Sequence, residues 1–292
     1  MQHITIDTAA GPRSALVWDT AAGTPWLHFA HATGMHAGLY ARLLAPLAER
    51  FRIVASDSRG HGRSPGGPVG DTTEWEVFAA DVLAVTDAVA PDAPWLLAGH
   101  SMGGAVALLA ADARPDRVAG LVLLDPPFIP FAIARAARAA GQTIPNPMAD
   151  QAGKRRADFP DVETARAAYA GRGVFRSWSD ADLDAYLADG LLPVVGGVTL
   201  ACAPAWEAAT FRGVSHRIEA ALARLDKPFA LIAGALGSTV PEAEFEIFAA
   251  HPRCVSAQRL PETTHFVPLE RGDAVRAAIV AVAEASSGAL QQ

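Results

Sequence analysis

The sequence is poor in cysteine and has no long hydrophobic run. Its 292 residues include 2 cysteines, Cys202 and Cys254, which form no Cys-x-x-Cys pair and give no disulfide scaffold. No apolar stretch reaches the roughly 18 residues of a membrane-spanning helix, and residues 1–10 lack the basic and apolar segments of a secretory signal. We therefore expect reduced thiols and a cytoplasmic protein without a membrane span.

Positive charge is also scarce. Lys+Arg number 24 against 31 Asp+Glu, so the formal net charge is -7 at pH 7, and no run of basic residues occurs. Such a chain is a poor ligand for nucleic acid or anionic membranes, which leaves a small molecule as the expected partner. With 51% hydrophobic and 19% charged residues, the chain has enough apolar material for one large core.

Eight short apolar runs bounded by turn residues predict strands. The middle ones are continuously apolar, which is typical of strands buried on both faces, and the turn between the first two suggests an antiparallel start. The predicted strands are Ile4–Asp7, Ala15–Asp19, Trp26–His31, Phe51–Asp57, Trp95–His100, Leu121–Asp125, Phe229–Gly234 and Cys254–Leu260.

Stretches with helical periodicity separate most of these runs. The alternation predicts an α/β fold in which a mostly parallel eight-stranded sheet is flanked by helices. The predicted core helices are Ala41–Arg50, Thr73–Ala90, Ser101–Ala113, Pro241–Ala250 and Ala274–Ala285.

The interval between Asp125 and Phe229 has no convincing strand. A crossover needs only about a dozen residues, so most of this interval is surplus. We expect a helical cap at residues 128–212, inserted between the sixth and seventh strands of a core formed by residues 1–127 and 213–292. Its predicted helices are Phe131–Ala140, Val162–Ala170 and Asp180–Ala188, while Val214–Leu225 returns to the core.

A Gly-x-Ser-x-Gly motif, Gly99 to Gly103, links a predicted strand to a predicted helix. In this context the motif is a nucleophile elbow, because glycines flanking Ser101 remove clashes between strand and helix in a tight turn. The turn would lift the Ser101 hydroxyl out of the sheet. It would also aim the helix N-terminus at a negative charge formed beside that hydroxyl.

A serine hydroxyl is a weak nucleophile and needs a base, which is oriented in turn by an acid. In such sheets the base follows the nucleophile in the chain and lies on a loop after the last strand. Of the later histidines, His216 falls on a predicted helix and His251 ends one. We predict His265, in a short loop after the final strand, as the base.

With these motifs the chain resembles the α/β-hydrolase superfamily, over nearly its whole length outside the cap. The resemblance implies that the backbone N–H groups of Thr33 and Met102 form an oxyanion hole, although Ala32 replaces the usual glycine of the first motif. The motifs are His31-Ala32-Thr33-Gly34, Asp57-Ser58-Arg59-Gly60-His61-Gly62-Arg63-Ser64, Gly99–Gly103 and Thr264-His265-Phe266.

A metal or cofactor is not expected. His31, His36 and His61 fall near one end of the predicted sheet, but they lack the local spacing of known zinc signatures, and a serine triad needs no metal.

The position of the acid that orients His265 departs from the pattern of most superfamily members, which carry this acid after the seventh strand. Here Gly234 to Pro241 contains no carboxylate. The best candidate is Asp125, which follows the sixth strand, where some members of the superfamily place their acid. We predict a triad of Ser101, Asp125 and His265. The alternatives are that Asp125 is only a turn residue, or that Ser101 and His265 form a dyad without an acid.

The predicted cap is rich in large apolar side chains, of which we select Phe128, Trp178 and Trp206 as substrate contacts. They favour a hydrophobic substrate shielded from water. The resulting hypothesis is a serine hydrolase that cleaves a carboxylic ester or lactone through an acyl-enzyme. C–C bond hydrolysis or acyl transfer by the same groups, or a slow-turnover ligand receptor, remain alternatives. The oligomeric state and the substrate's identity stay open.

Overall fold

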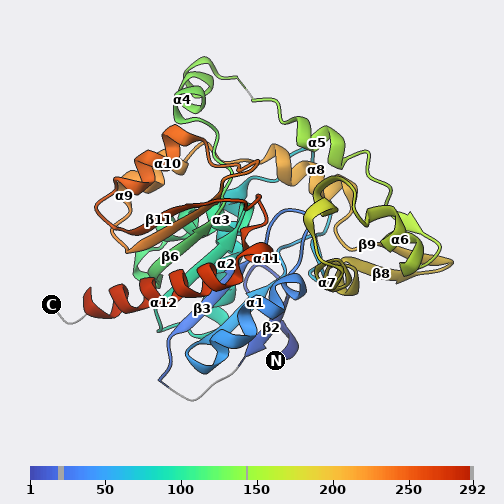
Figure 1. The fold of residues 1–292 in the computed structure, drawn as a ribbon, viewed down its shortest axis with the longest axis horizontal. Coiled ribbons are helices and arrows are strands. Elements are labelled where there is room, and N and C mark those ends of the chain that lie inside the picture. The colour runs from blue at the N-terminus through green and yellow to red at the C-terminus, as the bar shows by residue number, and fades with distance from the viewer. Residues whose placement is uncertain (19–22, 143, 290–292) are drawn as a thin grey trace.

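The computed structural model describes residues 1–18, 23–142 and 144–289, and is built around one eight-stranded sheet (Figure 1). Along the sheet the strand order is β1-β2-β4-β3-β5-β6-β10-β11. Strand β2 pairs antiparallel with β1 and β4, and all the other pairs are parallel. The strands are β1 (Gln2–Ile6), β2 (Arg13–Trp18), β3 (Trp26–Ala30), β4 (Arg52–Ser56), β5 (Trp95–His100), β6 (Val118–Leu124), β10 (Phe229–Gly234) and β11 (Cys254–Leu260).

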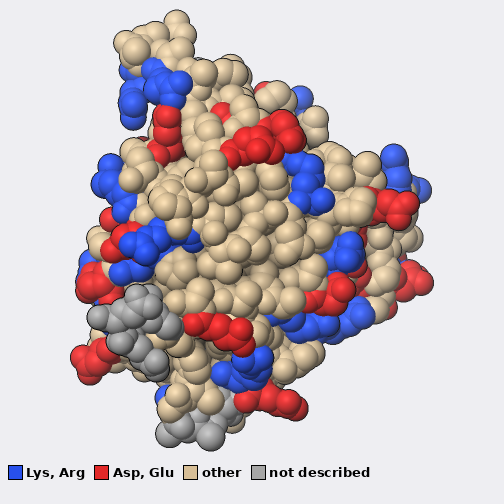
Figure 2. All heavy atoms as spheres, turned by 60° about the vertical axis from the view of Figure 1, so that its left-hand side comes forward, with Lys and Arg blue, Asp and Glu red and all other residues tan. Residues whose placement is uncertain are grey.

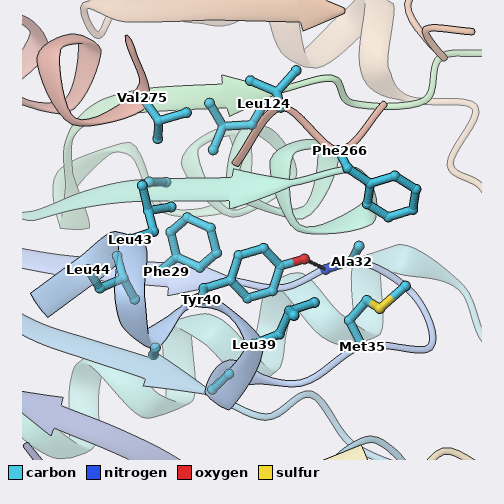
Figure 3. Packing of buried hydrophobic residues seen from close by; sticks show 14 of the residues in the cluster. Phe29, Ala32, Met35, Leu39, Tyr40, Leu43, Leu44, Leu124, Phe266 and Val275 are labelled. Atoms are coloured by element: carbon cyan, nitrogen blue, oxygen red, sulfur yellow. Dashed lines mark hydrogen bonds between the residues drawn. The ribbon is translucent and has the colours of Figure 1, made fainter. Parts of the chain in front are cut away.

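Helices cover both faces of this sheet and make two apolar layers. Successive residues of β5 enter different layers, since Leu96 joins the layer of α1 and α12 whereas Leu97 joins that of α2, α3, α9 and α10. Figure 3 shows part of the first layer, where Phe29 and Tyr40 pack beside Leu43. The core helices are α1 (Ala41–Leu44), α2 (Trp75–Val89), α3 (Met102–Ala113), α9 (Ile218–Arg224), α10 (Glu242–Ala249), α11 (Val267–Glu270) and α12 (Gly272–Ala289).

The predicted fold class is confirmed, and each predicted strand of the sheet is present within a few residues of its expected bounds. Asp19, at the end of the second predicted strand, lies outside the described residues. The predicted helix at Ala41–Arg50 is replaced by the short α1 between two 3-10 turns, Ala37–Tyr40 and Ala45–Glu49. Pro46, which has no N–H to donate, falls in the second of these turns.

Between β6 and α9 the chain leaves the sheet. Helix α4 lies at the top of Figure 1, and the elements from α5 to α8 lie at its right, beyond the carboxyl ends of the strands. The expectation that this interval contains no strand is wrong. Two short strands form a hairpin around Val195-Gly196, and a two-residue strand pairs with it. They are too short to show an alternating pattern, and β8 contains Pro193, which argues against a strand in a sequence. The elements are α4 (Phe131–Ala140), α5 (Pro147–Ala152), β7 (Asp158–Phe159), α6 (Val162–Tyr169), α7 (Asp180–Gly190), β8 (Leu191–Val194), β9 (Gly197–Leu200) and α8 (Pro204–Arg212).

Surface charge is mixed on the face shown in Figure 2, where basic and acidic side chains are interspersed around a broad uncharged area. Within the described residues, no helix is both long enough and apolar enough to cross a membrane.

Strand β5 and helix α3 meet at a crossing that only glycine allows. A Cβ at Gly99 would lie 2.2 Å from the Gly103 carbonyl carbon, and a Cβ at Gly103 would lie 2.1 Å from the Ala30 oxygen. The atoms in the way belong to the backbone and cannot rotate aside. The crossing therefore fixes the start of α3 against the end of β3.

We expect Gly103→Ala to lower the free energy of unfolding by about 3 kcal/mol or more, because the added methyl group forces backbone apart. Urea denaturation measures the loss. Gly153→Ala is the matched control, since its Cβ would lie 3.5 Å from the nearest atom, and we expect a change within about 0.5 kcal/mol. Equal midpoints for the two variants would contradict the packing argument.

Candidate active site

Ser101 occupies the sharp turn between β5 and α3. Its backbone has φ 54° and ψ -123°, a conformation that costs energy for any residue other than glycine. The turn is held because the Ser101 N–H donates to the Leu124 carbonyl of the neighbouring strand at 2.8 Å. The Ser101 side chain does not cap α3, so this strained turn is not explained by helix capping.

His265 and Asp125 are in direct contact. His265 Nδ1 lies 2.6 Å from Oδ2 of Asp125, whose side chain is fully buried after β6. An ionised carboxylate only accepts hydrogen bonds, so Nδ1 carries the proton and Nε2 is left as the nitrogen that can take or give one. The His265 ring also lies 4.8 Å from the ring of His100, the residue before Ser101. The structure thus brings His265 and Asp125 into contact and places His265 against the residue that precedes Ser101, at the carboxyl ends of β5, β6 and β11.

The Asp125 carboxylate is also held by the loop after β10, for which the sequence predicted only the absence of an acid. This loop (residues 234–239, the donor loop) supplies the Gly234 N–H and the Ser238 hydroxyl to Oδ1 at 2.9 and 2.6 Å. The Thr239 N–H donates to Oδ2 at 2.9 Å, and the Thr239 hydroxyl lies 2.8 Å from the Asp125 carbonyl oxygen and 3.1 Å from Oδ2. The loop that lacks an acid therefore provides hydrogen-bond donors for an acid located on another strand.

These donors decide the charge of the buried acid. Burial by itself raises the pKa of Asp125, but the hydrogen bond and charge of His265, followed by the bonds from Ser238 and Thr239, outweigh it. The net effect is a lowered pKa for Asp125. The carboxylate is therefore ionised at neutral pH despite its complete burial.

The loop after β3 (residues 31–34, the oxyanion loop) lies against the start of α3. The close approach of Gly103 to the carbonyl groups of Ala30 and His31 brings Met102, the first residue of α3, next to this loop. Thr33 is buried within it. Both residues assigned to the oxyanion hole by resemblance thus lie on segments that touch each other beside Ser101.

The histidines considered for a metal site have other surroundings. His31 Nδ1 lies 2.8 Å from the Ala32 oxygen, and its Nε2 accepts the Ser58 N–H at 2.8 Å. Burial lowers the pKa of both His31 and His61 to about 3, so both rings are neutral. Among the described residues, no group of three His, Cys, Asp or Glu side chains is arranged to hold a metal ion.

The three predicted substrate contacts have different neighbours. Trp178 packs edge-on against Phe266, the residue after His265, with ring centroids 5.0 Å apart. Trp206 packs against Gly60 and Gly66, and a Cβ at either glycine would lie within 2.5 Å of the Trp206 indole. This contact packs α8 against the loop after β4. Phe128 stacks on Phe248 of α10 at 4.7 Å and lines a groove of about 270 Å³. Trp178 is thus the one of the three that contacts the residue following His265.

A half-buried ion pair within the inserted segment, which the sequence did not predict, packs on the oxyanion loop. Arg155 donates to Glu207 at 2.5 Å and to the Tyr186 hydroxyl at 3.1 Å. Glu207 Oε1 fills the space that Gly34 leaves open, only 2.6 Å from where a Cβ would be. No local pattern signals this pair, because its members are 52 positions apart.

The chain matches known proteins over most of its length. A family model described as Serine aminopeptidase, S33, matches residues 25–270. Monoglyceride lipase of Homo sapiens is 41% identical over 110 residues, covering 36% of each protein. Lipase LipV of Mycobacterium tuberculosis is 35% identical over 171 residues, covering 57% of this chain and 58% of that protein.

Among solved structures, the crystal structure of E-2-(acetamidomethylene)succinate hydrolase superposes with a TM-score of 0.79 and 23% identity, over 97% of this chain and 99% of that one. At this identity the likeness concerns the fold alone. The alignments to the curated relatives are partial, since this chain spans about a third of the length of the monoglyceride lipase.

The donor loop makes stability depend on pH in a defined direction. Because the pKa of Asp125 is lowered on folding, its donors stabilise the protein above the ordinary Asp pKa near 4. Their contribution is lost as the pH falls through the lowered pKa. We expect Ser238→Ala to reduce the free energy of unfolding by about 1.5–3 kcal/mol at pH 7, and by clearly less near pH 2.

Denaturant unfolding at several pH values measures this difference. Ser287→Ala is the control, because its hydroxyl donates to the neutral Ala283 carbonyl of α12 and its loss should not vary with pH in this way. A pH-independent loss for Ser238→Ala would show that its hydroxyl does not support the charge of Asp125.

Proposed function

Since the chain belongs to the serine aminopeptidase S33 family of α/β-hydrolases, we propose that it is a serine hydrolase acting on a carboxylic ester or lactone of a hydrophobic substrate. The observation that carries the proposal is the 2.6 Å contact between His265 Nδ1 and Asp125 Oδ2, beside a serine in a strained elbow. A buried acid that orients an imidazole is the arrangement that activates a serine hydroxyl.

The proposed reaction begins with attack of the Ser101 oxygen on the substrate carbonyl carbon. His265 Nε2 takes the hydroxyl proton, and Asp125 stabilises the imidazolium that forms. The negative charge that develops on the carbonyl oxygen is met by the N–H groups of Thr33 and Met102. Collapse of this intermediate expels the alcohol, which receives the proton from His265 and leaves an acyl group on Ser101.

Water completes the cycle by the same route. His265 removes a proton from the water as its oxygen attacks the acyl carbon, and the proton then returns to the Ser101 oxygen as the carboxylic acid leaves. A lactone follows the same steps, except that the leaving hydroxyl stays attached to the acid. The residues need no group from outside the chain for any of these proton transfers.

Two observations support a hydrophobic substrate. The names of the similar proteins include a monoglyceride lipase and a lipase. In addition, Trp178 belongs to an aromatic cluster with Phe175, Tyr186 and Phe266, whose rings lie 4.9, 5.8 and 5.0 Å from the Trp178 ring, and Phe266 itself contacts His265. We propose that residues 128–212 act as a cap that places such apolar surface over Ser101.

Ser101→Ala is expected to abolish hydrolysis of p-nitrophenyl esters and covalent labelling by a fluorophosphonate probe, because the nucleophile is gone. Wild-type protein is assayed on esters of several acyl chain lengths and on lactones. We expect an initial burst of acylation of Ser101, followed by repeated turnover of the substrate. Tight ester binding by the wild type without turnover would instead favour a receptor and refute the enzymatic proposal.

Asp125→Asn is expected to retain the fold and to lower kcat by about 10³–10⁴-fold, since an amide cannot fix the tautomer of His265 or balance its charge. Circular dichroism checks the fold, and steady-state kinetics on an activated ester measure the loss. Asp226→Asn, in the turn before β10, serves as the control and should retain wild-type rates. Equal rates for Asp125→Asn and wild type would refute the assignment of the acid.

A further inference from the structure

A buried chain of hydrogen bonds runs behind the candidate active site. The Ala32 N–H donates to the Tyr40 hydroxyl oxygen at 3.3 Å, a contact drawn in Figure 3. The Tyr40 oxygen lies 2.8 Å from His100 Nδ1, and His100 Nε2 lies 2.8 Å from the His265 carbonyl oxygen. Tyr40 and His100 are both fully buried.

Each proton in this chain has only one possible place. The His265 carbonyl can only accept, so His100 Nε2 carries a proton and donates it. In a neutral imidazole Nδ1 is then an acceptor, so the Tyr40 hydroxyl donates to it and its oxygen is free to accept the Ala32 N–H. All three hydrogen bonds therefore donate in the same direction, from the oxyanion loop toward the loop that carries His265.

This series of hydrogen bonds keeps the same proton placement around neutral pH. Burial, followed by the charge of nearby His265, lowers the pKa of His100 to about 3, and burial raises the pKa of Tyr40. Both side chains are therefore neutral wherever His265 can act as a base. Hydrogen bonds in such a buried environment strengthen one another, so the three links act as a unit.

The three links end on the three segments that the reaction requires. One end holds the peptide between His31 and Ala32, while the His31 ring, with its proton on Nδ1, holds the Ala32 carbonyl at 2.8 Å. Together they fix the backbone that presents the Thr33 N–H. The middle of the chain is His100, next to Ser101, and the other end is the backbone of His265 itself.

We propose that Tyr40 and His100 are positioning residues, which tie the oxyanion loop and the backbone of the base to the nucleophile elbow through one buried hydrogen-bonded chain. This inference rests on the proposed function. Neither side chain takes part in the proton transfers proposed above. They hold the N–H donors and the imidazole in register with Ser101, and misplacement of such groups by about 1 Å is enough to slow a reaction about 10²-fold.

Tyr40→Phe tests the link at the oxyanion loop, because it keeps the ring that packs on Phe29 and removes only the hydroxyl. We expect kcat for an activated ester and the rate of fluorophosphonate labelling each to fall about 10-fold or more, with KM changed less than about twofold. Thr86→Val is the matched control, since it also deletes a fully buried hydroxyl, one that donates to Leu83 within α2. Equal effects of the two variants would overturn the proposal.

Two substitutions of His100 test its hydrogen bond to the His265 carbonyl, one that can keep this bond and one that cannot. The side-chain amide of His100→Gln can still donate to the His265 carbonyl, whereas His100→Leu cannot. We expect kcat to fall in the order wild type, His100→Gln, His100→Leu, at nearly constant KM. Identical kcat values for the two variants would exclude a positioning role for this bond.

Nitrogen NMR of histidine-labelled wild-type protein reads the proton placement without any variant. We expect His100 to show a protonated Nε2 and an unprotonated Nδ1, unchanged between pH 5 and pH 9. A proton on Nδ1, or titration within that range, would overturn the inference even if every variant misfolded. Absence of ester turnover and labelling in wild type would instead count against the proposed function, so the two failures are distinguishable.

Discussion

The candidate site depends on keeping one carboxylate charged inside the protein. Asp125 is fully buried, and transferring an ionised carboxylate from water into a protein interior is costly unless it is well hydrogen-bonded. Here two backbone N–H groups, the Ser238 hydroxyl and the His265 ring donate to its two oxygens, and the Thr239 hydroxyl is shared between Oδ2 and the Asp125 carbonyl oxygen. The position of the base and its tautomer both follow from how this charge is satisfied.

The same constraint explains the form of the loop after β10. In the resemblance that the sequence suggested, this loop supplies an acid, whereas here it supplies donors to an acid on the neighbouring strand. The parallel pairing of β6 with β10 makes the exchange possible, because the carboxyl ends of adjacent parallel strands meet at one edge of the sheet. Ser238 and Thr239 can therefore contact Asp125 although they are more than 110 positions away in the sequence.

Close backbone packing and buried neutral side chains keep the surrounding loops in place. Gly99 and Gly103 let α3 approach β3 so closely that the start of the helix touches the oxyanion loop. Behind it, Tyr40 and His100 have each hydrogen-bonding atom matched to a partner of the opposite kind. On the side of the inserted segment, Glu207 presses on Gly34 while Arg155 balances its charge.

The sequence by itself determined the strands of the sheet, their succession with the core helices along the chain, and the residues Ser101 and His265 as candidates, while Asp125 came from a resemblance to part of the superfamily. Apolar runs, helical periodicity and glycine spacing are local properties, and they can be read directly from neighbouring residues. Only the tertiary structure decided which groups surround Asp125, that β7, β8 and β9 form a small second sheet, and that Tyr40 bridges Ala32 to His100. These features depend on contacts between residues far apart in the chain, and such contacts leave no periodic signal in a single sequence.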